Sequence, residues 1–163
     1  MERYSVEIGV NGRRLTADVS AADTLLEVLR AKLGAQEVKN GCGQGDCGAC
    51  TVLLDGAAVN SCLTLAVQAD GREVTTLKGL GTPEDPHPLQ TSFVAHGAIQ
   101  CGFCTSGIVL AAKSFLDENP TPTRTEIREG ISGNLCRCTG YTKIVDAIED
   151  AARHPERLGG RSR

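Results

Sequence analysis

Aromatic side chains are scarce in this 163-residue sequence, which contains three Phe, two Tyr and no Trp. Two units of about 75 residues with so few large side chains would have thin cores, and metal sites commonly supplement such cores. A strong charge of either sign is also lacking: the net charge is -3, so nothing indicates a nucleic-acid partner. No segment approaches the ~20 apolar residues that would span a membrane.

A secretory signal is not expected either, because residues 1–12 contain no long apolar run. The pair Arg13-Arg14 is interpreted as a strand end or turn, since acidic residues interrupt the segment after it. The default compartment is then the reducing cytoplasm, where clustered cysteines indicate metal or redox chemistry more often than disulfides. Residues 155–163 are expected to form a loose, solvated tail.

Cysteine and glycine, in contrast, are plentiful, with eight and 19 residues. The cysteines fall into two sets of four, and four thiolates are the number that completes an iron–sulfur or zinc site. The first set follows the C-x4-C-x2-C…C spacing of plant-type [2Fe–2S] sites: Cys42, Cys47, Cys50 and Cys62. The second set joins C-x2-C to a distant C-x-C: Cys101, Cys104, Cys136 and Cys138.

The loop around the first set, residues 41–50, is rich in glycine. An iron–sulfur cluster is a compact anion that needs backbone N–H groups wrapped around its sulfurs, and glycine permits the close approach and positive φ this requires. The supporting positions are Gly41, Gly43, Gly45 and Gly48. Zinc is the main alternative, although zinc loops favour two close cysteine pairs. A Rieske-type centre would need two histidine ligands, and all three histidines lie far from this set.

The N-terminal half has strand periodicity. Apolar residues alternate over 4–10, Asn11-Gly12 is a hairpin turn signal, and the alternation continues over 15–19. A helix is expected from about Asp23 to Gly34, followed by strands over 51–54, 58–61 and 73–77. This order predicts an α+β chain whose first domain, residues 1–78, is the β-grasp fold of plant-type ferredoxins.

The C-terminal half should be helical after a linker over 79–88 that contains two Gly and three Pro. Helices are expected over 89–96, over 105–118 and around 144–151. A further helix is expected to begin at Thr123, which forms a capping box with Glu126. Residues 89–154 are therefore predicted to form a small helical bundle that carries the second cysteine set.

Spacing alone leaves zinc open for this second set, but its neighbours are more specific. The segments Gln100–Thr105, QCGFCT, and Gly133–Tyr141, GNLCRCTGY, closely resemble the helical iron–sulfur domain of the molybdenum hydroxylases. This family includes xanthine dehydrogenase, aldehyde oxidoreductase and bacterial carbon monoxide dehydrogenase. The loop 41–50 resembles the family's first cluster motif, and the resemblance extends from about Tyr4 to Ala152 in the same order.

The resemblance implies a β-grasp domain and a four-helix domain that each bind one [2Fe–2S] cluster. The cluster of the second set would lie next to molybdenum, and the cluster of the first set nearer FAD. The implied partners are a large molybdopterin-binding subunit, with the cofactor expected as the cytosine dinucleotide, and a medium FAD-binding subunit, in a dimer of heterotrimers. Electrons would pass from molybdenum to FAD through both clusters, with no catalytic residue or substrate site on this chain.

The resemblance also assigns two pterin contacts. Gln100 matches a glutamine that hydrogen-bonds the pterin, and Cys138 matches a ligand that touches it. One departure is Ser106, where many relatives have Pro; if Thr105 caps the helix, this is a first-turn position that favours Pro without requiring it. The alternative function is a free-standing, two-cluster ferredoxin that carries electrons between partners. The substrate of the complex cannot be read from this chain.

Overall fold

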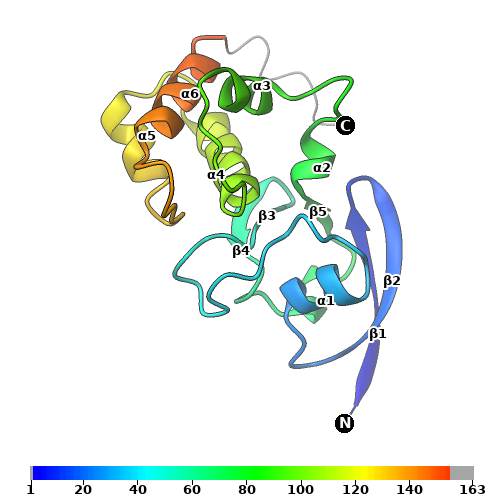
Figure 1. Cartoon of the computed structure of the whole chain (residues 1–163). Helices are drawn as coiled ribbons and strands as arrows, with labels where there is room; N and C mark the ends of the chain where they lie inside the picture. Colours follow the sequence, from blue (N-terminus) through cyan, green and yellow to red (C-terminus); the bar gives the residue numbers. More distant parts are fainter. Residues whose placement is uncertain (1, 155–163) are drawn as a thin grey trace.

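The fold is known from a computed structural model that describes residues 2–154, with a strand-rich N-terminal part and a helical C-terminal part (Figure 1). The N-terminal part contains β1 (Arg3–Val10), β2 (Arg13–Ser20), α1 (Leu25–Ala31), β3 (Thr51–Leu54), β4 (Ala57–Asn60), the 3₁₀ helix η1 (Ala66–Ala69) and β5 (Glu73–Thr75). The C-terminal part contains α2 (Leu77–Leu80), α3 (Pro88–Ala95), α4 (Thr105–Glu118), α5 (Arg124–Gly130) and α6 (Thr142–Ala152).

The five strands form one mixed sheet in the order β2-β1-β5-β3-β4. β1 and β2 are antiparallel, and both residues of their turn have positive φ, 53° at Asn11 and 78° at Gly12. β5 lies parallel to β1 and antiparallel to β3, so it joins the two hairpins. Helix α1 buries Leu25, Val28 and Leu29 in the same core as the sheet. This is the β-grasp arrangement that the sequence predicts.

The helical part has its own hydrophobic core, centred on α4 and α6. Helix α4 is buried over most of its length, because its side chains are apolar or small on nearly every face. Helix α5 begins at a capping box in which the Thr123 hydroxyl accepts the N–H of Glu126 and the Glu126 carboxylate accepts the N–H of Thr123. α3 packs against α6, whose buried face includes Ile144 and Ile148.

The element boundaries differ from the sequence-based expectation between the two parts. The last strand ends at Thr75 rather than at residue 77, and α2, which was not expected, follows it. Leu80, at the start of the expected linker, is buried in the helical core. Helix α2 is a single turn and is too short to show helical periodicity in the sequence. The same holds for η1, which was also not expected. Helix α1 begins at Leu25, two residues after the expected start at about Asp23, and Thr24 is its N-cap.

The two parts meet where α4 lies on the β3–β4 hairpin (Figure 1). Leu53 of β3 extends into the helical core, and the backbone N–H of Ala58 donates to the Ser114 hydroxyl at 3.2 Å. Within residues 2–154, no helix is long and apolar enough to cross a bilayer. The tail expected over 155–163 lies outside the described residues.

Candidate iron–sulfur centres

The first cysteine set is brought together by the loop 41–50 and the turn after β4. Cys50 immediately precedes β3 and Cys62 follows β4, and both are buried, at 3% and 7% exposed. Cys42 and Cys47 lie nearer the surface. The β3–β4 hairpin therefore brings Cys62 back to the loop 41–50, although Cys62 lies 12 residues after the end of that loop.

Backbone N–H groups point at the first set from within its own loop. The Cys42 sulfur accepts from the N–H of Gln44 at 3.5 Å and of Cys47 at 3.4 Å, and these bonds lower the pKa of Cys42 to about 6. Burial and contact with Cys50 raise the pKa of Cys62 to about 11. The loop thus favours negative charge on the outer sulfur.

The loop glycines meet two different geometric needs. Gly43, Gly45 and Gly48 have positive φ of 69°, 89° and 66°, the left-handed region that glycine adopts without strain. Gly41 does not have positive φ, but a Cβ there would lie 2.7 Å from the Cys47 sulfur. The sequence prediction grouped these four positions, whereas the structure separates backbone conformation from close approach.

The second cysteine set lies at the entrance to α4 and in the loop before α6. Cys104 is the N-cap residue of α4, and Cys101 lies three residues before it, outside the helix. The sulfurs of Cys101 and Cys138 are 3.6 Å apart and exposed, whereas burial and contact with Cys136 raise the pKa of Cys104 to about 12. The Thr139 hydroxyl donates to the Cys136 sulfur at 3.1 Å.

Tyr141 supports this second loop, a role that sequence reasoning missed. Its φ of 68° is in the left-handed region, which non-glycine residues rarely adopt. In this conformation its hydroxyl accepts the backbone N–H of Cys136 at 2.7 Å. A tyrosine five residues after a cysteine has no local pattern that distinguishes this role from core packing.

The thiols contact one another in four pairs, two in each set. The pairs are Cys42 with Cys47, Cys50 with Cys62, Cys101 with Cys138, and Cys104 with Cys136. All eight are free cysteines, and no three His, Cys, Asp or Glu side chains within residues 2–154 form a site for a single metal ion. Two thiols for each of two irons is the number that a [2Fe–2S] core requires, so both sets fit that group.

The other residues assigned from the family resemblance lie at the edge of the second set. Gln100 and Cys138 are both exposed. Ser106 is buried in the first turn of α4, and its hydroxyl has no hydrogen-bond partner among the described residues. Cys104 is the N-cap of this helix, so Thr105 is its first helical residue rather than the cap considered from sequence.

Two family matches cover most of the chain. Residues 8–77 match the 2Fe-2S iron-sulfur cluster binding domain, and residues 76–149 match the [2Fe-2S] binding domain. The nicotine 6-hydroxylase small subunit of Paenarthrobacter nicotinovorans is 48% identical over 161 residues, 99% of this chain and 95% of the relative. This chain belongs to the small [2Fe–2S] subunits of the molybdenum hydroxylases.

Other members of the family agree in sequence and in fold. The xanthine dehydrogenase iron-sulfur-binding subunit of Escherichia coli O157:H7 is 43% identical over 93% of this chain and 96% of its own length. The crystal structure of quinoline 2-oxidoreductase from Pseudomonas putida 86 superposes with a TM-score of 0.91 at 47% identity, covering 96% of this chain and 98% of that one. The chain is thus an electron-transfer subunit of a multi-subunit oxidoreductase with two [2Fe–2S]-binding domains, rather than a free-standing carrier.

Proposed function

We propose that this chain passes single electrons from a molybdopterin centre to FAD through two [2Fe–2S] clusters. Cys101, Cys104, Cys136 and Cys138 would hold the cluster nearer molybdenum, and Cys42, Cys47, Cys50 and Cys62 the cluster nearer FAD. One observation supports the step between the two sites: the backbone N–H of Leu135, next to Cys136, donates to the carbonyl oxygen of Cys47 at 2.9 Å. A single hydrogen bond therefore connects the backbones of the two sets.

When bound, a [2Fe–2S] cluster accepts and releases one electron at a time, which divides a two-electron oxidation into single steps. The protein's part is to hold the sulfurs and to offset their charge. N–H groups of Gln44 and Cys47 do this in the first set, and the Thr139 hydroxyl does it in the second. No catalytic acid, base or nucleophile on this chain is required.

A partner surface is proposed around the second set. Its outer thiols, Cys101 and Cys138, are exposed, and they are surrounded in sequence by exposed apolar side chains: Ile99, Phe103 and Leu135. Exposed apolar groups of this size commonly mark contact surfaces. We place the large molybdopterin subunit here, with the pterin, as the cytosine dinucleotide, against Gln100 and Cys138.

The remaining assignments follow the family. A medium FAD-binding subunit would face the first set, and two such trimers would form the complex. A cytoplasmic location suits eight cysteines of which none is joined in a disulfide. Substrate choice is assigned to the large subunit, because relatives named for nicotine and for xanthine match this chain at similar identity, 48% and 43%.

The test compares Cys138→Ser with Cys62→Ser in the protein purified together with its partner subunits. After reduction with dithionite, each variant should lose a different one of two electron paramagnetic resonance signals and keep the other. When a substrate of the complex is added instead, Cys138→Ser should leave the flavin oxidised. Normal flavin reduction in Cys138→Ser would contradict the route, and zinc in place of iron would contradict the clusters themselves.

A further inference from the structure

The two cysteine loops contact each other closely where the β-grasp and helical parts meet. A Cβ on Gly48 would lie 2.4 Å from the carbonyl oxygen of Gly133, and a Cβ on Gly107 would lie 2.2 Å from the carbonyl oxygen of Gly48. Nearby, the Phe103 ring lies 3.6 Å from the Cβ position of Gly41. The backbones therefore approach to a distance that only glycine allows.

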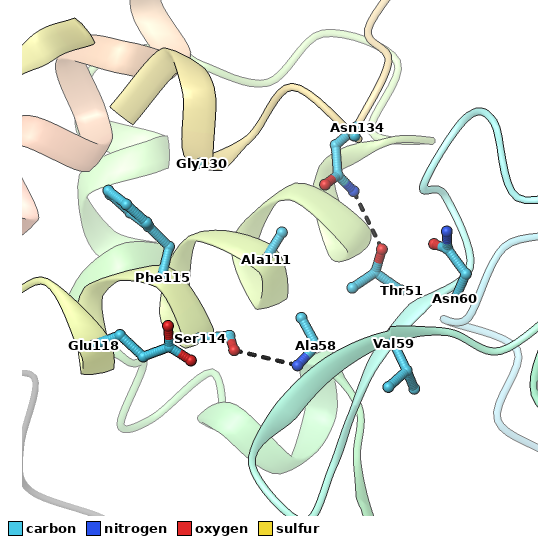
Figure 2. Close-up of a pocket in the computed structure, with 11 residues that line it drawn as sticks. Thr51, Ala58, Val59, Asn60, Ala111, Ser114, Phe115, Glu118, Gly130 and Asn134 are labelled. Carbon is cyan, nitrogen blue, oxygen red and sulfur yellow. Dashed lines mark hydrogen bonds between the residues drawn. The ribbon is translucent and has the colours of Figure 1, made fainter. Parts of the chain in front are cut away.

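Asn134 lies between these loops and joins them through its side chain. It is 6% exposed, although the residues on either side, Gly133 and Leu135, are exposed. Its amide nitrogen donates to the carbonyl oxygen of Gly48 at 2.9 Å and lies 3.3 Å from the Thr51 hydroxyl, as Figure 2 shows for Thr51. A buried amide with two partners 83 and 86 residues away is a specific link between the two parts.

The first loop does not need Asn134 to keep its own shape. The carbonyl oxygen of Gly48 also accepts from the backbone N–H of Thr51 at 3.1 Å and from the Thr51 hydroxyl at 2.7 Å. Both of those bonds lie within the N-terminal part. Losing the Asn134 amide would therefore remove the side-chain link between the loops, and leave the Leu135 N–H bond to Cys47, while the turn at Gly48 stays hydrogen-bonded.

We propose that Asn134 is a positioning residue that fixes the separation and orientation of the two cluster sites, and so sets how fast electrons pass between them. The proposal rests on the electron-transfer function proposed above. The side-chain hydrogen bonds of Asn134 go to Gly48 and Thr51 rather than to a cysteine. Asn134 directly precedes Leu135, whose N–H donates to the carbonyl oxygen of Cys47. The bond from Asn134 to Gly48 therefore keeps the N–H of Leu135 in position to donate to the Cys47 carbonyl.

The experiment uses Asn134→Ala and Asn134→Asp, with Asn60→Ala as the matched control. Asn60 also donates its amide to a carbonyl of the first loop, that of Gly45 at 3.1 Å, but from within the same part of the chain. Asn134→Asp keeps the side-chain volume and places a carboxylate oxygen against the Gly48 carbonyl, so it tests the link without creating a cavity.

Three readouts are taken on the protein purified with its partner subunits and reduced with dithionite. Pulsed electron paramagnetic resonance measures the dipolar interaction between the two reduced clusters, which falls with the inverse cube of their separation. Redox titration measures each cluster's potential, and hydrogen exchange measures protection of residues 133–136. In both Asn134 variants we expect a weaker, broader dipolar interaction and faster exchange at Leu135, with potentials unchanged; Asn60→Ala should leave the dipolar interaction unchanged.

An unchanged dipolar interaction and unchanged exchange in both Asn134 variants would overturn the proposal while the electron-transfer function stands. Loss of a cluster in both variants would also overturn it, because it would show a structural role in cluster retention. Failure to find two cluster signals in the unsubstituted protein would instead contradict the proposed function itself.

Discussion

The contact between the loops predicts different costs for two glycine substitutions that have similar backbone strain. Gly48 and Gly56 have φ of 66° and 88°, so alanine at either position must adopt a left-handed conformation. That conformation costs an L-residue about 1–2 kcal/mol. At Gly56 nothing lies within 4 Å of the new Cβ, whereas at Gly48 it meets the Gly133 carbonyl at 2.4 Å and the Asn134 amide at 2.5 Å.

The shorter of these clashes is with the Gly133 carbonyl, which is backbone from the other part of the chain and has no rotamer to adopt. Overpacking of this kind typically costs about 1–3 kcal/mol. Gly48→Ala should therefore lower the free energy of unfolding by about 2–5 kcal/mol, against about 1–2 kcal/mol for Gly56→Ala. Each kcal/mol corresponds to about 2–4 °C in the melting temperature of a domain of 150–250 residues.

The assay is thermal unfolding of the iron-loaded protein, followed by loss of visible absorption and, separately, by far-ultraviolet circular dichroism. Gly48→Ala should melt clearly below Gly56→Ala by both signals, because separation of the loops exposes both cysteine sets. Equal melting temperatures for the two variants would refute the claim that the loops contact each other at Gly48.

Two further predictions concern the second cysteine loop. Thr139→Val removes the hydroxyl that donates to the Cys136 sulfur, so the potential of that cluster should fall by on the order of tens of millivolts, where about 59 mV is a tenfold change in a one-electron equilibrium. Redox titration monitored by electron paramagnetic resonance checks this, and an unchanged potential would contradict it. Tyr141→Phe leaves the half-buried N–H of Cys136 without its acceptor, so the melting temperature should fall by about 2–4 °C for a cost of about 1 kcal/mol. A melting temperature equal to that of the unsubstituted protein would show that this bond contributes nothing.

The sequence predicted the parts of this protein that depend on local pattern. Alternation over 4–10 and the Asn11-Gly12 turn identified the first hairpin, and the Thr123 capping box identified the start of α5. The grouping of cysteines into two sets of four also follows from spacing and flanking residues. The hairpin and capping signals each lie within about ten residues of chain, whereas the two cysteine sets run over 42–62 and 101–138 and were grouped by motif.

Features that depend on distant contacts were not predictable in this way. Spacing cannot say that the Cys101 sulfur lies beside Cys138 rather than beside Cys136, because the folding of α4 and the loop before α6 decides it. Asn134 reads as an ordinary polar loop residue until Gly48, 86 residues earlier, is placed against it. α2 was missed because one helical turn carries too few residues to show a period.

The central claim is that both cysteine sets hold [2Fe–2S] clusters, and spin quantitation tests it most directly. The protein purified with its partner subunits is reduced with dithionite, and its electron paramagnetic resonance spectrum is integrated alongside iron analysis. We predict two distinct signals that together account for two unpaired spins per chain. A single signal, or a colourless protein that contains zinc, would contradict the claim.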